Sequence, residues 1–187
     1  PGFLDQDVLA SRRRGGLEFS ARRHPDPRPA ILDFARQLAG RNIHLVLVPT
    51  PTKAMVHPEH FGGRADDQTP LHNHSWSKLV ETLRAEHITV FDPLPVLVAR
   101  RQHDDSDQFL ATDTHWRPEA MEAVAGALAA TLVEHGLSRR RRSGPMWVRG
   151  SRKVTTQGEL VTMMRIGPGT TAFDAETVTI LPVLTPD

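Results

Sequence analysis

The chain has 187 residues, of which 39% are hydrophobic, and its 23 basic and 22 acidic side chains give a formal net charge of +1. This composition is typical of a globular domain large enough to bury a core, and the near-neutral charge gives no indication of nucleic-acid binding. The absence of cysteine excludes disulfides and cysteine-ligated zinc or iron–sulfur centres. No apolar run approaches the roughly 18 residues that a membrane span requires.

Residues 1–29 combine a run of three arginines with a glycine pair and with prolines at 25, 27 and 29. This pattern predicts a partly ordered entry segment, followed by one domain over residues 30–187. The chain begins with Pro1 and Gly2 rather than with methionine, so we expect a fragment or a processed form.

Apolar residues recur at helical spacing after Pro29, and Gly40 provides a stop, which predicts a first helix. The apolar run over 43–48, bounded by Asn42 and Pro49, predicts a buried and parallel strand. Residues 49–72 are rich in proline, glycine, histidine and aspartate, which predicts a long loop.

A second amphipathic helix is predicted over 73–86, with Asn73 as its cap, and a third over 118–135, with Pro118 in its first turn and Gly136 after its end. The alternation of helices and strands indicates an α/β architecture with a parallel sheet. The remaining expected elements are a strand at 88–91, a helical turn at 94–101, β-like segments at 146–156 and 177–183, and a short helix at 158–164.

The sharpest chemical feature is Asp113-Thr114-His115, immediately before the third helix. An aspartate and a histidine two residues apart on a loop can point the same way. The carboxylate then binds one imidazole nitrogen and fixes the tautomer, and the other nitrogen is free to act as a general base. The same spacing also occurs in surface loops and helix caps, so it does not define a site by itself.

Lys53 belongs to a proline-stiffened segment, Val48-Pro-Thr-Pro-Thr-Lys53, that follows the predicted strand. Loops at the carboxyl ends of parallel strands form the ligand-binding edge of α/β sheets. Lys53 could therefore hold an anion or a sugar hydroxyl, or it could be a solvated side chain beside a turn.

Two further patterns suggest other functions. The histidines at 57, 60, 72 and 74 crowd one loop, and His72-x-His74 could supply two zinc ligands. However, no His-Glu-x-x-His pattern occurs, and we expect no metal. The basic run Arg139–Arg142 has no interleaved aromatic residues and is better interpreted as a solvated connector than as a nucleic-acid site.

These features together resemble the SGNH-hydrolase-like acetyltransferase family of the alginate O-acetylation proteins (AlgX/AlgJ-like). The resemblance covers residues 30–185. It depends on Val-Pro-x-Pro-x-Lys53 after a buried strand, the proline-bearing loop at 56–59, Asp92-Pro93, and Asp113-Thr-His115-Trp116 opening an alanine-rich helix. It implies an SGNH-hydrolase-like three-layer α/β/α fold with a mainly parallel sheet.

The resemblance implies that Asp113 and His115 are catalytic, and Lys53 and Trp116, from the same two motifs, are expected to contact substrate. The family's nucleophilic serine lies in a Gly-Asp-Ser-like turn, and no such sequence occurs in this chain. We therefore expect the domain to be truncated before that turn. Family positions often held by tyrosine, by serine or threonine, and by glycine are occupied here by His57, Arg117 and Ala120.

The implied function is O-acetylation of hydroxyls on an exported bacterial polysaccharide, in the periplasm, with neither a metal nor an organic cofactor. The expected partners are the polysaccharide, an acetyl donor protein or carrier, and a membrane-associated export complex, without nucleic acid. This chain alone is expected to be inactive. A non-catalytic carbohydrate-binding or assembly module and a metal-dependent hydrolase that uses His72 and His74 are the alternatives.

Overall fold

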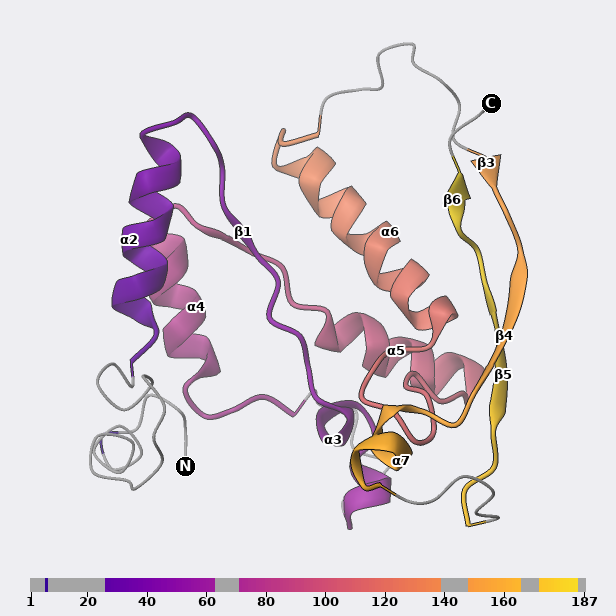
Figure 1. Ribbon diagram of the computed structural model, residues 1–187. Coiled ribbons are helices and arrows are strands. Elements are labelled where there is room, and N and C mark those ends of the chain that lie inside the picture. Colours follow the sequence, from indigo (N-terminus) through magenta and orange to yellow (C-terminus); the bar gives the residue numbers. More distant parts are fainter. Residues whose placement is uncertain (1–5, 7–25, 63–70, 139–147, 166–171, 185–187) are drawn as a thin grey trace. The chain divides into compact units, whose positions relative to one another are not determined.

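The structure is a computed structural model that describes residue 6 and residues 26–62, 71–138, 148–165 and 172–184 (Figure 1). The chain forms two compact units, residues 1–49 with 71–92 and residues 50–70 with 93–187. Most of the predicted entry segment and the basic run Arg139–Arg142 lie outside the described residues. The predicted domain boundary at residue 30 stays a prediction.

The first unit contains two helices and one pair of short parallel strands. Helix α2 (Arg28–Ala39) begins beside a proline and ends at Gly40, as the sequence predicts, and α4 (Trp76–Ala85) begins two residues later than Asn73 would allow. Strands β1 (Val46–Leu47) and β2 (Thr89–Val90) pair in parallel with Val46 opposite Thr89. The apolar run over 43–48 is thus only partly a strand, and it is half-buried rather than buried, with Ile43 exposed.

The core of this unit lies between its helices and its strand pair. Leu79, Leu83 and Ile88 are buried at its centre. Apolar side chains from α2 and β1, among them Ile31 and Leu47, pack against them. The helical spacing of the apolar residues in α2 and in α4 is therefore explained by the face that each helix packs against this core.

The second unit carries the chemical motifs. The predicted loop over 49–72 contains helix α3 (Lys53–Val56) and the 3-10 helix η2 (Pro58–Phe61), because good helix formers follow Thr52 and a proline opens the second turn. The predicted turn at 94–101 is a full helix, α5 (Leu94–Asp104), and α6 covers Pro118–Glu134. The buried side chains of this unit include Val56, Leu94, Leu97, Val98, Phe109, Val124 and Val178.

The rest of the second unit is an antiparallel ribbon with one short helix. Strand β4 (Arg152–Thr156) pairs with β5 (Glu176–Ile180), and β3 (Val148–Arg149) pairs with β6 (Val183–Leu184). Helix α7 (Glu159–Met163) follows β4 (Figure 1). Among the described strands, only β1 and β2 pair in parallel, so the expected mainly parallel sheet is not confirmed. Alternating polar residues suit a ribbon with one solvated face, whereas parallel strands need both faces covered.

No helix within the described residues is long and apolar enough to cross a membrane.

Candidate active site

The Asp-x-His segment forms the tip of a closed loop that leads into α6. Phe109 and Trp116 form an antiparallel bridge, and the backbone N–H of Arg117 donates to the carbonyl of Gln108 at 2.9 Å. Pro118 then opens the helix, where its missing N–H costs no hydrogen bond. The loop therefore returns on itself and presents the two side chains at its tip.

The predicted hydrogen bond between Asp113 and His115 is confirmed. The imidazole Nδ1 lies 2.6 Å from Oδ1 of Asp113, and the backbone N–H of His115 donates to the same oxygen at 3.0 Å. Asp113 is only 7% exposed, whereas the side chain of His115 is 72% exposed. Because Nδ1 faces the carboxylate, Nε2 is the nitrogen available to take a proton from a bound hydroxyl.

The surroundings of the pair shift both pKa values toward the charged forms. Burial alone would raise the pKa of Asp113, but hydrogen bonds from the Glu159 N–H and from His115 outweigh it, so this pKa is lowered. The hydrogen bond to Asp113, followed by the charge of Glu159, raises the pKa of His115. The result is an ionised carboxylate beside an imidazole of increased basicity, as general-base catalysis requires.

Lys53 binds the backbone of the loop just before the Asp113–His115 segment. Its ammonium group donates to the carbonyl oxygens of Leu110 at 2.6 Å and Ala111 at 2.7 Å. Burial lowers the pKa of Lys53, and the negative charges that oppose this shift are those of Asp107, Glu176 and Asp113. Two of the three ammonium protons are thus used within the protein, and a contact between Lys53 and substrate stays a prediction.

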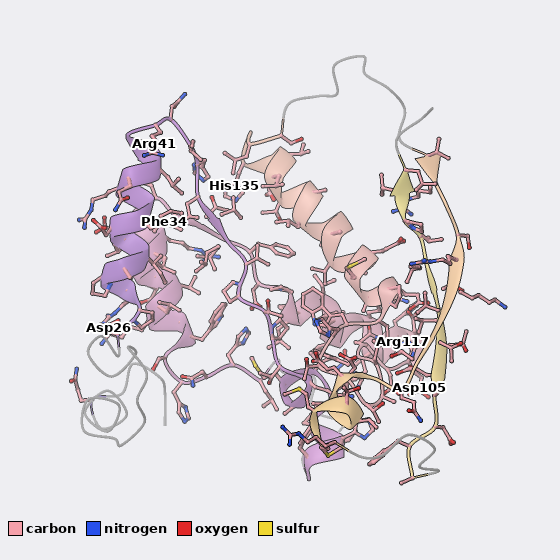
Figure 2. All side chains as sticks on the ribbon, in the orientation of Figure 1. Asp26, Phe34, Arg41, Asp105, Arg117 and His135 are labelled. Atoms are coloured by element: carbon pink, nitrogen blue, oxygen red, sulfur yellow. The ribbon has the colours of Figure 1, made fainter. Side chains whose placement is uncertain are left out.

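Glu176, at the start of β5, also binds the Asp-x-His loop, and nothing in the sequence indicates this contact. It accepts the backbone N–H of Ala111 at 2.6 Å through Oε1. Through Oε2 it binds Arg117, which is labelled in Figure 2, at 2.7 Å. Arg117 is one of the positions at which the chain departs from the family pattern. Its ion pair gives that departure a structural role, since it ties the start of α6 to the ribbon.

His57, another departure, is buried beneath the loop with only 2% exposure. Its Nε2 accepts the backbone N–H of Gln108 at 2.9 Å, so Nδ1 carries the proton and donates to Glu59 at 2.9 Å. Arg101 in α5 donates to Glu59 at 3.3 Å and to the Val56 carbonyl at 2.5 Å. This network joins η2 and α5 to Gln108, at the start of the Asp-x-His loop.

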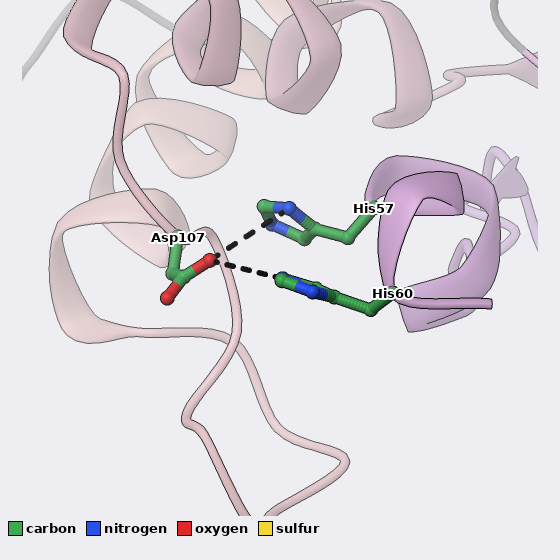
Figure 3. Close-up of side chains that lie close together, drawn as sticks. All are labelled: His57, His60 and Asp107. Atoms are coloured by element: carbon green, nitrogen blue, oxygen red, sulfur yellow. Dashed lines mark ion pairs between the residues drawn. The ribbon is translucent and has the colours of Figure 1, made fainter. Parts of the chain in front are cut away.

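The groups that lie close together differ from the His72-x-His74 pair, which the sequence offered only as an alternative. His57, His60 and Asp107 place potential ligand atoms within 4.8 Å of one another (Figure 3). However, both ring nitrogens of His57 already make hydrogen bonds. His72 belongs to the other unit, where its Nε2 lies 2.5 Å from Asp92. Metal binding by either set would therefore have to displace existing hydrogen bonds.

Asp113, His115 and Glu159 form a second group of the same spacing. There too, Nδ1 of His115 and both oxygens of Asp113 already make hydrogen bonds within the protein. The arrangement matches an oriented base better than an open set of metal ligands.

Trp116 lines a groove of about 520 Å³ that also borders Asp113. Most of the other lining side chains are apolar and come from α6, β4 and β5, among them Met121, Val154 and Ile180. The indole Nε1 is buried and has no hydrogen-bond partner within the described residues. An indole beside a groove is suited to stacking on a sugar ring, although substrate contact by Trp116 stays a prediction.

A family comparison assigns this mixed α/β domain, with its Asp113–His115 loop, to the SGNH hydrolase-like class. The family model described as the SGNH hydrolase-like domain of the acetyltransferase AlgX matches residues 5–183, and the chain belongs to this family. The fold is supported by similarity to the O-acetyltransferase domain of Pseudomonas putida AlgJ, with a TM-score of 0.59 and 21% identity. That match covers 82% of this chain and 54% of the other.

Two curated relatives are each described as a probable alginate O-acetylase AlgJ. The protein from Pseudomonas aeruginosa is 37% identical over 99 residues, which is 53% of this chain and 24% of the relative. The protein from Azotobacter vinelandii is 32% identical over 114 residues, which is 58% of this chain and 27% of the relative. The matched part therefore spans about a quarter of these relatives' length.

Proposed function

We propose that this chain supplies the base of a polysaccharide O-acetyltransferase, with His115 as general base and Asp113 as the group that orients it. The single observation that carries the proposal is the 2.6 Å contact between a buried carboxylate and one nitrogen of an exposed imidazole. Membership of an acetyltransferase family supports acetyl transfer as the reaction.

In the proposed reaction, His115 Nε2 takes the proton of a serine hydroxyl as that oxygen attacks the acetyl carbonyl of the donor. The proton then passes to the leaving group, and acetyl-serine remains. A sugar hydroxyl gives its proton to the same nitrogen and attacks the ester, and the serine recovers the proton as acetyl-sugar departs. Asp113 stays ionised throughout and stabilises the imidazolium.

The serine is proposed to come from a part of the protein outside these 187 residues. Two facts support this: the chain contains no Gly-Asp-Ser sequence, and it covers only part of its relatives. In the whole protein, β1 and β2 would belong to a mainly parallel sheet within a three-layer α/β/α fold. Lys53 and Trp116 would contact the substrate, Trp116 from the groove beside Asp113.

The proposed substrate is an exported polysaccharide related to the alginate named for the AlgJ relatives. The acetyl donor would be a protein or a carrier, and the reaction would take place in the periplasm beside a membrane-associated export complex. Neither a metal nor an organic cofactor takes part in the proposed steps.

A non-catalytic carbohydrate-binding module is the second candidate. The specific observation that favours it is the groove beside Trp116, which could hold a sugar chain whether or not a nucleophile is present. Binding of a polysaccharide by a full-length protein that never forms an acetyl-serine would support this alternative.

The deciding experiment compares this chain with a longer form of the same protein on an activated acetyl ester. The 187-residue chain should show no turnover that depends on His115. The longer form should release acetate, and His115→Ala should reduce its kcat by a factor of about 10³ or more. Asp113→Asn should reduce it comparably, because an amide no longer holds the required tautomer.

His103→Ala is the matched control, because this histidine is 90% exposed on α5 and plays no part in the proposed steps. It should retain wild-type turnover. Full activity of His115→Ala in the longer protein would show that the chemistry lies elsewhere.

A further inference from the structure

Glu159, the first residue of α7, contacts every residue of the Asp113-Thr114-His115 segment. Its backbone N–H donates to Oδ2 of Asp113 at 2.9 Å, and its carboxylate accepts the hydroxyl of Thr114. The same carboxylate oxygen lies 3.6 Å from Nδ1 of His115. A single residue far along the chain thus meets both members of the candidate dyad.

The bond from the Glu159 N–H limits rotation of the Asp113 carboxylate. Oδ1 of Asp113 faces His115. Among the described residues, the N–H of Glu159 is the one donor that forms a hydrogen bond with Oδ2. A carboxylate held at both oxygens cannot turn about its last torsion, which is otherwise soft. Asp113 is also buried, so a water molecule would be a poor replacement for this donor.

Gly158 makes this contact possible because the two backbones approach closely. It has a φ of +80°, and a Cβ at this position would lie 2.6 Å from the carbonyl carbon of Thr112. The backbone N–H of Leu160 donates to the Thr112 carbonyl at 3.1 Å, and the Thr112 hydroxyl donates to the Gln157 carbonyl. Only glycine fits this crossing, and it places the next N–H at Asp113.

We propose that Glu159 is a positioning residue for the Asp113–His115 pair. Its backbone N–H fixes the orientation of the Asp113 carboxylate, and its side chain supplies a second negative charge that favours the protonated imidazole. This inference rests on the proposed function only for its catalytic meaning, because both contacts exist within this chain.

The charges that act on the pair come from three elements. Asp113 belongs to the loop itself, Glu159 to α7 and Lys53 to α3. The charge of Lys53 and that of Asp113 attract each other, which favours the ionised carboxylate. Glu159 favours the protonated imidazole and, with its side chain 37% exposed, is only partly screened by water. Removal of its charge should therefore lower the pKa of His115.

The test is an NMR titration of the His115 imidazole in the 187-residue chain, which needs no enzyme activity. Glu159→Gln keeps the size of the side chain and the backbone N–H but removes the charge. The titration midpoint of His115 should move to lower pH than in the wild type, and Glu159→Asp should restore part of the shift. Glu134→Gln, an exposed change on α6, is the matched control and should leave the midpoint unchanged.

A second pair of variants isolates the backbone N–H. Glu159→Ala and Glu159→Pro both lack the carboxylate, but only proline lacks the N–H. Proline is tolerated at the first position of a helix, and Gly158 has a ψ of 157°, which suits a residue that precedes proline. The midpoint of Asp113 should therefore be higher in Glu159→Pro than in Glu159→Ala.

Two results would overturn the proposal. One is a His115 midpoint in Glu159→Gln equal to that of the wild type, and the other is identical Asp113 titration in the alanine and proline variants. Neither depends on turnover, so failure of this inference is distinguishable from failure of the proposed acetyl transfer.

Discussion

His57 offers the clearest test of how the loop is supported, because each of its ring nitrogens has a separate partner. Nε2 accepts the N–H of Gln108, which is fully buried, and Nδ1 donates to Glu59. His57→Ala removes a buried ring and leaves that N–H without an acceptor. The cavity and the orphaned donor together should lower the free energy of unfolding by about 3–5 kcal/mol.

Two further substitutions separate the cavity from the hydrogen bond. His57→Phe fills the space but cannot accept the Gln108 N–H, so it should cost about 1–3 kcal/mol. His57→Gln can place an amide oxygen near the position of Nε2 and should cost less than phenylalanine. His60→Ala, an exposed neighbour on η2, is the control and should stay within about 0.5 kcal/mol of the wild type.

The measurement is urea unfolding followed by far-UV circular dichroism, with amide hydrogen exchange of Gln108 as a local readout. Exchange at Gln108 should accelerate in the alanine and phenylalanine variants and remain slow in His57→Gln. A phenylalanine variant as stable as the wild type, with slow exchange at Gln108, would refute the view that this hydrogen bond supports the loop.

The remaining predictions concern the pH dependence of stability, the contacts of Lys53 with the loop, and zinc binding. The folded pKa of Asp113 is lowered, so its contribution to stability should be present above about pH 4 and lost as the pH falls through the folded pKa. Urea unfolding midpoints measured from pH 2 to 6 should show this loss in the wild type and not in Asp113→Asn. Because the folded pKa of His115 is raised, its contribution should be complete below about pH 6.5 and lost as the pH rises through the folded pKa, and His115→Ala should not show that loss. Lys53→Met removes the donor to two loop carbonyls and should lower the unfolding free energy by about 1–2 kcal/mol, with faster hydrogen exchange at Asp113. Elemental analysis of protein purified without chelator should find no stoichiometric zinc, and one equivalent that is lost on mutation of His72 and His74 would contradict this expectation.

Features encoded by neighbouring residues were predictable from the sequence. Helices α2 and α6 begin beside or at prolines and end one and two residues before a glycine, as their sequence signals indicate. The bond between Asp113 and His115 follows from a spacing of two residues on a loop. In each case the interacting groups lie close together along the chain, so the pattern itself contains the information.

Features that depend on distant residues were not predictable in this way. Glu176 and Lys53 bind the loop from positions more than 50 residues away, and an isolated glutamate or lysine carries no signal of its partner. The sequences of β4 and β5 indicate strands, but the direction in which they pair depends on the partner strand. The helices within residues 49–72 were missed because proline and glycine dominated that stretch.

The Asp-x-His loop has little regular structure of its own, and its shape is imposed by contacts from elsewhere in the second unit. Lys53 holds two carbonyls, Glu176 holds an N–H, and Glu159 holds the buried carboxylate. Because each contact satisfies a different polar group, loss of one leaves the others in place but frees part of the loop. Under the proposed function, the orientation of His115 is set by this chain before the proposed serine approaches, and preorganisation of this kind lowers the cost of reaching the reactive geometry. If the whole protein carries out the proposed acetyl transfer, substitutions at these distant positions should therefore reduce its kcat without altering Asp113 or His115.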